Sequence, residues 1–338
     1  MHPDADITTV GPDVVVVHHE RRARRYDDLA PGEVHELDGL EVRTLDHPGG
    51  ELLARFATVN DVHFGEVRCG VVEGHEETIG PILQAEPDEP PYPVTMNEAA
   101  VAEIQAADVD AVFVKGDLTT TGTDEEYADF LDTYQGAFGD RLTHVRGNHD
   151  AYRGQSYADW PVQRVDLPGV TVVLLDTTVP FRSSGGLTVE QLDELDEIAA
   201  EADRPVVVLG HHHVWAPSSA ERPDTYFGIH PDWSERLVEV AARRPRIVGY
   251  FAGHTHRNRV RRFAATGAMP WVEVACVKDF PGAWAEYRVH EGGIVQLHHR
   301  ISTPEALDWT ERTRGMFLGM YGQYAFGKLE DRCFMLDR

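Results

Sequence analysis

Five short apolar segments of this chain each run directly into a polar cluster rich in aspartate, asparagine and histidine. The apolar segments are residues 52–59, 111–114, 142–145, 206–209 and 247–251. In the same order, the clusters are Asp61-Val62-His63, Gly116-Asp117, Gly147-Asn148-His149-Asp150, Gly210-His211-His212-His213 and Gly253-His254-Thr255-His256. Such segments predict buried strands, and the helical patterns between them predict an α/β fold. Because the carboxyl ends of the strands of an open α/β sheet line one crevice, we expect the clusters to converge there.

The residue types in these clusters are those that bind metal ions. Carboxylate, amide and imidazole groups suit manganese, iron, zinc or magnesium better than thiophilic metals. The candidate ligands are Asp61, His63, Asp117, Asn148, His211, His254 and His256. They are too many for one open site, but they fit two ions that share a bridging carboxylate and clamp both the attacking and the leaving oxygen at phosphorus. His149 is placed to serve a leaving group or a developing charge.

The charge balance restricts the partners of such a site. Acidic residues number 57 against 31 basic ones, which gives a formal net charge of −26. An acidic surface repels phosphate backbones and anionic lipids, so we expect neither a nucleic-acid polymer nor a membrane as partner. A small anionic substrate stays compatible, because bound cations override the global field locally. The expected partner is therefore a small phosphate ester.

The cysteines indicate a reducing compartment. Cys69, Cys276 and Cys333 are odd in number, are widely spaced and include no Cys-x-x-Cys pair. This pattern supports neither a disulfide framework nor a thiolate zinc site. The first residues lack a signal-peptide pattern, and the longest apolar runs have the length of a strand. We therefore expect a cytoplasmic protein.

Three regions are expected along the chain. Residues 1–50 contain short strand-like segments separated by the basic run from Arg21 to Arg25, and predict an N-terminal β-rich extension with the arginines exposed. Residues 51–303 combine strand–helix alternation with a later β-rich part, which predicts two packed sheets flanked by helices. Residues 304–338 predict a C-terminal helical tail that docks on its own core or on a second subunit, so a homo-oligomer is one alternative.

The blocks DVH, GD, GNHD, GHHH and GHTH resemble, in order, the five signature blocks of the calcineurin-like metallophosphoesterase superfamily. The resemblance covers residues 56–299 and implies an α/β fold in the form of a four-layer α/β/β/α sandwich with a dinuclear site. The implied ligand sets are Asp61, His63 and His256 for one ion and Asn148, His211 and His254 for the other, with Asp117 bridging.

The resemblance also implies a mechanism. A hydroxide between two divalent or trivalent ions (manganese, iron, zinc or a mixture) would attack phosphorus. His149 would protonate the leaving oxygen or stabilise the transition state, and Asp150 would orient His149.

Details of the blocks point to one branch of the superfamily. The stretch GDLTTTGTDEEYADF is similar to class III cyclic-nucleotide phosphodiesterases and bacterial glycerophosphodiesterases. Serine/threonine phosphatases carry GDxxDRG instead, and purple acid phosphatases need a tyrosine where Thr120 stands. After His211 and His212 the chain continues with His213 and Val214 rather than the usual Pro-Pro, so the pocket rim differs and His212 stays an alternative ligand to His211. The loop over residues 216–231 is expected to shape a nucleoside or alcohol pocket or to act as a structural lid.

The sequence therefore predicts a dinuclear-metal phosphodiesterase for a small soluble diester, either a cyclic nucleotide or a glycerophosphodiester. A phosphomonoesterase or nucleotide pyrophosphatase is an alternative, because the same pair of ions accepts either leaving group. A binding scaffold without catalysis is a further alternative that the complete ligand set disfavours.

Overall fold

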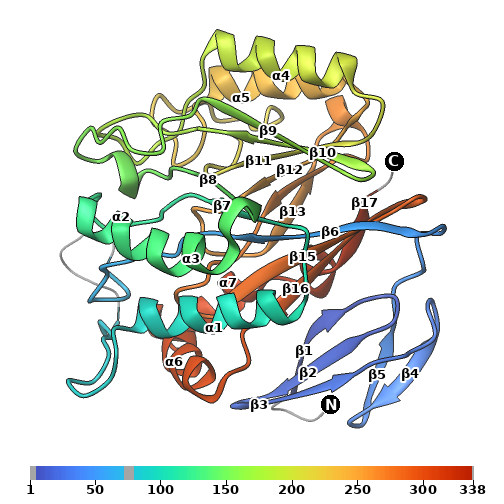
Figure 1. Ribbon diagram of the computed structural model, residues 1–338, viewed down its shortest axis with the longest axis vertical. Helices are drawn as coiled ribbons and strands as arrows, with labels where there is room; N and C mark the ends of the chain where they lie inside the picture. The colour runs from blue at the N-terminus through green and yellow to red at the C-terminus, as the bar shows by residue number, and fades with distance from the viewer. Residues whose placement is uncertain (1–4, 72–79, 337–338) are drawn as a thin grey trace.

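Two six-stranded β-sheets pack face to face in the computed structural model, which describes residues 5–71 and 80–336 (Figure 1). The first sheet has the strand order β17-β16-β15-β6-β7-β8, and the second has the order β13-β14-β12-β11-β10-β9. The strands of the first sheet are β6 (Leu52–Val59), β7 (Ala111–Lys115), β8 (Leu142–Val145), β15 (Ala283–His290), β16 (Gly293–Arg300) and β17 (Phe334–Leu336). Those of the second are β9 (Val162–Leu167), β10 (Val170–Leu175), β11 (Val206–Gly210), β12 (Ile247–Ala252), β13 (Arg259–Arg262) and β14 (Pro270–Glu273).

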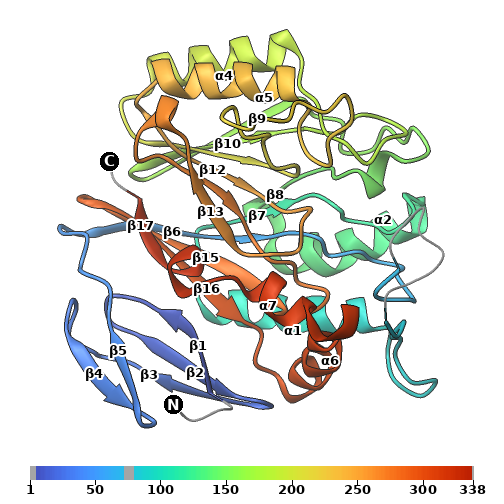
Figure 2. The same ribbon diagram turned by 180° about the vertical axis from the view of Figure 1, so that it is seen from behind.

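Helices cover the outer face of each sheet, as Figures 1 and 2 show from opposite sides. The helices on the first sheet are α1 (Tyr92–Ala106), α2 (Asp124–Phe130), α3 (Gly136–Phe138) and α6 (Pro304–Arg314). The helices on the second sheet are α4 (Val189–Glu201) and α5 (Pro231–Arg243). Three large clusters of buried apolar side chains fill the spaces between these layers. The expected four-layer α/β/β/α sandwich is confirmed.

The strands that lead into the polar clusters run parallel within each sheet. In the first sheet β6 pairs with β7 and β7 with β8, and in the second β11 pairs with β12. Every residue of β7 and β11 is buried, which is why β11, and β7 as far as Val114, are continuously apolar rather than alternating. Parallel pairing places the polar residues that follow these strands at one edge of each sheet.

The N-terminal region forms two small sheets beside the sandwich, in blue in Figure 1. Its strands are β1 (Ala5–Val10), β2 (Val15–His19), β3 (Arg22–Tyr26), β4 (Val34–Leu37) and β5 (Leu40–Arg43). The basic run, expected between two strands, is itself edge strand β3, and its arginines are exposed as predicted. Val14 and Val16 pack against Val295 and Leu297 of β16, which joins the region to the sandwich.

The C-terminal tail is helical over most of its length but ends as a strand. After α6 the chain bends at Leu318, whose φ is 57°, and continues as α7 (Tyr321–Phe326) and α8 (Leu329–Arg332). It then pairs with β16 as β17. Trp309 and Tyr321 are buried in the core of this chain, so the tail packs on its own domain. The boundaries proposed at residues 50 and 303 stay predictions. None of the helices in the described ranges has the length and apolarity to cross a bilayer.

Candidate active site

The five polar clusters come together where β6, β7, β8, β11 and β12 end, and Asp117 lies at their centre. Its Oδ2 atom lies 3.5 Å from Nε2 of His63 and 3.3 Å from Nε2 of His211. Asp61 belongs to two groups whose ligand atoms all lie within 4.8 Å of one another: Asp61, His63 and His256, and Asp61, Asp117 and His211. The two groups share the carboxylate of Asp61, so they are adjacent, as a pair of neighbouring cations would require.

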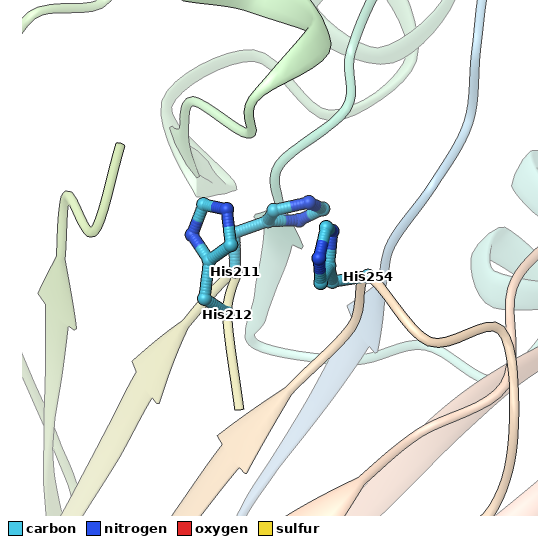
Figure 3. A group of neighbouring side chains, drawn as sticks. All are labelled: His211, His212 and His254. Carbon is cyan, nitrogen blue, oxygen red and sulfur yellow. The ribbon is translucent and has the colours of Figure 1, made fainter. Parts of the chain in front are cut away.

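Asn148 and His254 complete the other half of the cluster. The Oδ1 atom of Asn148 lies 3.0 Å from Nε2 of His211. Figure 3 shows the rings of His211, His212 and His254 gathered beyond the ends of β11 and β12, with ligand atoms within 4.8 Å of one another. The structure thus brings together all seven side chains that the sequence analysis named as candidate ligands.

His211 and His212 differ in their surroundings. Nε2 of His211 faces Asp117, while its Nδ1 lies 2.9 Å from the carbonyl oxygen of Lys115. Nδ1 of His212 lies 2.8 Å from Oγ1 of Thr177, and its Nε2 has no hydrogen-bond partner among the described residues. Of the two, only His211 is placed at the central carboxylate.

The backbone of the ligand loops has an uncommon conformation. Five candidate ligands have left-handed φ values: Asp61 (54°), His63 (50°), Asp117 (48°), His254 (67°) and His256 (53°). Residues other than glycine seldom adopt this conformation, which costs about 1–3 kcal/mol and persists where the surroundings enforce it, often at functional sites. The backbone itself therefore marks this cluster as a functional site.

Two glycines let the ligand loops approach each other closely. A Cβ atom on Gly147 would lie 2.2 Å from Oδ1 of Asp117. A Cβ atom on Gly253 would lie 2.7 Å from Oδ2 of Asp61. Both distances are too short for non-bonded atoms, so only glycine fits at these positions.

Asp117 and His211 favour each other's charged forms. Burial alone would raise the pKa of Asp117, but the charges of His211 and His149 hold this pKa well below its usual value. Burial would lower the pKa of His211, yet the charge of Asp117 raises it to about 9. A proton and a cation compete for the same lone pair on Nε2 of His211, so metal binding there releases a proton.

The donor set fits metal ions. Both ring nitrogens of His63 are buried without a hydrogen bond among the described residues, and the Glu66 carboxylate, 3.5 Å away, contacts only Nδ1, which leaves Nε2 open to a cation. A buried polar atom without a partner is costly unless it binds something. Burial holds the pKa of His63 well below its usual value, which keeps the ring in the neutral form that a metal requires. Together with the oxygen atoms of Asp61 and Asp117, this ring forms a donor set suited to manganese, iron or zinc.

His149 lies beside the candidate ligands and is oriented by a backbone carbonyl. Its Nδ1 atom lies 2.7 Å from the carbonyl oxygen of Thr120. Its ring centroid lies 4.6 Å from that of His63. The side chain therefore lies next to the candidate ligands, and its Nδ1 atom is already hydrogen-bonded to the backbone.

Asp150 was expected to orient His149, which stays a prediction, and its carboxylate contacts the backbone of the neighbouring loops. The carboxylate of Asp150 accepts hydrogen bonds from the backbone amides of Gly147, Leu118 and Thr119. The two residues lie in a short 3₁₀ turn (His149–Ala151), in which successive side chains point about 120° apart. Through these hydrogen bonds Asp150 connects the loop after β7 with the loop after β8.

The loop over residues 216–231 supplies a contact that the sequence did not indicate. The carbonyl oxygen of Phe227 lies 2.9 Å from Nε2 of His254. The ring of Phe227 stacks on the ring of His254 with centroids 4.0 Å apart, and Phe227 is 56% exposed. This contact could not be predicted from the sequence, because every residue has a backbone carbonyl.

Comparison with known proteins gives this cluster a family context. The calcineurin-like phosphoesterase family matches residues 54–258. A probable glycerophosphodiester phosphodiesterase GpdQ of Arcobacter nitrofigilis is 28% identical over 247 residues, which cover 64% of this chain and 81% of that protein. A 3',5'-cyclic adenosine monophosphate phosphodiesterase CpdA of Pseudomonas aeruginosa is 26% identical over 181 residues, which cover 52% of this chain and 64% of that protein.

A solved structure shares the fold. A dimetal phosphatase of Danio rerio superimposes with a TM-score of 0.57 at 16% identity, over 74% of this chain and 98% of that one. Since the family match takes in every candidate ligand from Asp61 to His256, the chain belongs to the calcineurin-like phosphoesterase family and is a metal-dependent phosphoric ester hydrolase.

Proposed function

We propose that this protein is a dinuclear-metal phosphodiesterase that hydrolyses a small soluble phosphate diester. The observation that carries the proposal is the position of Asp117. One oxygen of its carboxylate lies 3.5 Å from His63 and 3.3 Å from His211, so it faces histidines of both halves of the cluster. A carboxylate so placed suits two cations about 3.5–4 Å apart.

Under this proposal the seven ligands divide into two sets. Asp61, His63 and His256 would hold one ion, Asn148, His211 and His254 would hold the other, and Asp117 would serve both. Bound ions of manganese, iron, zinc or a mixture supply Lewis-acid charge that activates water and stabilises the transition state at phosphorus.

His149 is the proposed proton donor to the leaving oxygen. A carbonyl oxygen only accepts hydrogen bonds, so the contact with Thr120 keeps a proton on Nδ1 of His149. Nε2 is then the ring atom that can give a proton to the substrate.

The loop after Asp117 supports the assignment to the diester branch. The carboxylate of Glu126 accepts hydrogen bonds from the backbone nitrogen and Oγ1 of Thr121 and from the backbone nitrogen of Thr123. This closed loop presents Thr120, whose Oγ1 donates to the carbonyl oxygen of His63 and whose own carbonyl holds His149. The stretch shared with phosphodiesterases thus positions the proposed acid. Relatives named as glycerophosphodiester and cyclic-nucleotide phosphodiesterases support either substrate class.

Turnover of model esters tests the proposal. The protein would be loaded with manganese, iron or zinc singly and given bis(p-nitrophenyl) phosphate and p-nitrophenyl phosphate. We expect faster hydrolysis of the diester, followed by turnover of a cyclic nucleotide or a glycerophosphodiester in a wider panel. Failure to hydrolyse the diester with any metal would overturn the proposal, and faster hydrolysis of the monoester would favour the phosphomonoesterase alternative.

We also propose that the enzyme acts in the cytoplasm. All three cysteines, Cys69, Cys276 and Cys333, are buried and unpaired. Free thiols are typical of proteins from reducing compartments, which supports this location.

A further inference from the structure

The histidines of the two proposed metal positions differ in the group that contacts the outer ring nitrogen, which is the nitrogen that points away from the metal position. The first position is that of Asp61, His63 and His256, and the second is that of Asn148, His211 and His254. At the second position, backbone carbonyl oxygens lie 2.9 Å from the outer ring nitrogens of His211 and His254. At the first position, Oε2 of Glu66 lies 3.5 Å from Nδ1 of His63. Nδ1 of His256 lies 3.4 Å from Oδ2 of Asp279. Carboxylates therefore stand behind both histidines of the first position.

Lys278 connects these two carboxylates. Its Nζ atom lies 2.7 Å from Oε1 of Glu66 and 4.0 Å from Oδ2 of Asp279. The side chains of Lys278, Glu66 and Asp279 are 7%, 13% and 3% exposed, so solvent screens them little. We call these three residues the carboxylate–lysine network.

The C-terminal tail fixes this network. The hydroxyl of Tyr321 in α7 donates a hydrogen bond of 2.6 Å to Oδ1 of Asp279. The indole nitrogen of Trp309 in α6 donates one of 2.8 Å to the carbonyl oxygen of Lys278. The thiol of Cys276 also lies 2.9 Å from Oδ1 of Asp279. Oδ1 of Asp279 is therefore occupied, and Oδ2 is the oxygen that faces His256.

We propose that Glu66 and Asp279 are positioning residues for His63 and His256, and that the tail is part of the metal centre through Tyr321. A carboxylate behind an imidazole fixes the proton on the outer nitrogen, aims the lone pair of the inner nitrogen and increases its basicity. The inner nitrogens are the Nε2 atoms, which face Asp117 and Asp61 at 3.5 and 3.4 Å. This inference rests on the proposed dinuclear site.

Manganese binding to the full-length protein tests the inference. The variants Asp279→Asn and Tyr321→Phe would be compared with the wild type by calorimetric titration and by electron paramagnetic resonance of free and bound Mn²⁺. We expect Asp279→Asn to bind one of the two ions about 10–100-fold more weakly and to keep the other. Tyr321→Phe, which loses only the hydroxyl, should weaken binding of the same ion by a smaller factor. Asp279→Ala should weaken it more than Asp279→Asn, because the amide oxygen of asparagine can still accept the proton of His256 Nδ1.

Two matched variants control for general damage to the core. Glu103→Gln changes a partly buried acid that accepts hydrogen bonds from Trp284 and Ser302. Tyr287→Phe removes a buried hydroxyl that donates to Gln296. Both should lower the melting temperature without changing either manganese affinity.

The outcomes separate this inference from the proposed function. A wild type with two manganese sites and variants of unchanged affinity would overturn the role of the carboxylate–lysine network alone. Equal losses in Glu103→Gln and Tyr287→Phe would also overturn it, because the effect would then come from packing. A wild type that binds fewer than two ions would overturn the dinuclear proposal first, and this inference with it.

Discussion

The backbone nitrogen of His149 donates a hydrogen bond of 3.0 Å to Oδ1 of Asp117, the carboxylate whose other oxygen faces both halves of the metal cluster. The proposed acid is therefore attached through its backbone to the proposed bridging ligand. Its side chain takes no part in that attachment, so the imidazole can be removed without breaking it.

His149→Ala is expected to keep both ions and to lose about 10²–10⁴-fold in kcat, the usual contribution of a general acid. The loss should be larger for an alkyl leaving group than for p-nitrophenolate, which leaves without a proton. Metal content by mass spectrometry and kcat on both kinds of ester check this. An enzyme that keeps full activity on alkyl diesters would show that another group supplies the proton.

Gly147→Ala is expected to abolish binding of at least one ion. The added methyl group would lie 2.2 Å from Oδ1 of Asp117, so this carboxylate must move away from the position that serves both halves. Gly136→Ala is the matched control, because Gly136 is helical and a Cβ there meets no atom within 4 Å. Alanine is favoured over glycine inside a helix by about 0.5–1 kcal/mol, so the control should bind two ions and be slightly more stable. Two tightly bound ions in Gly147→Ala would contradict the close approach of the two loops.

The ligands could be predicted because each lies just after a buried strand, and parallel strands bring their carboxyl ends to one edge. Four other features of the site could not be predicted. Thr120 and Phe227 act through backbone carbonyls, which carry no sequence signal. Glu66 and Lys278 are 212 residues apart, and the antiparallel pairing of β15 with β6 brings the loops that carry them together. The direction of Asp150 depends on a single 3₁₀ turn.

The same reasoning explains the fold. Strands with buried, continuous apolar sequences were predictable, because burial on both faces dictates their composition. Strand β3 is an exposed edge rich in arginine, so it lacks any apolar pattern. Strand β17 has only three residues, Phe334–Leu336, and forms because β16 offers a free edge to pair with.

Phe227→Ala tests which substrate class the site accepts. The ring is 56% exposed and stacks on His254, so its free side can receive a planar nucleobase. Stacking of a base on an aromatic ring contributes about 1–3 kcal/mol, so kcat/KM for a cyclic nucleotide should fall about tenfold or more. A glycerophosphodiester has no base and should change by less than about twofold. Equal losses for both substrates would mean that the ring serves His254 alone.

His18 makes the stability depend on pH at the junction between the N-terminal region and the sandwich. Its ring nitrogens lie 2.9 Å from Oγ1 of Thr8 and 3.0 Å from Oγ of Ser302. Burial, with a smaller effect of the Arg300 charge, lowers the pKa of His18 from 6.5 to about 3. The folded protein binds this proton more weakly than the unfolded chain does. The stabilising contribution is therefore complete above pH 6.5 and is lost as the pH falls toward 3.

His18→Gln removes this titration while keeping groups that can bond to Thr8 and Ser302. Between about pH 7.5 and about pH 5, the variant should gain about 2 kcal/mol in free energy of unfolding relative to the wild type. Urea unfolding of both proteins at the two pH values measures the change. A difference that stays constant with pH would show that His18 titrates normally in the folded protein.

The left-handed backbone at five of the ligands has a consequence for the strain in the main chain. Glycine adopts that conformation without strain, so replacing Asp61 or His256 by glycine would relieve the main chain while removing a ligand. The main chain at these positions would therefore be less strained with a residue that cannot bind a metal ion. Local backbone strain is thus part of what the chain tolerates in order to place aspartate and histidine side chains at these positions.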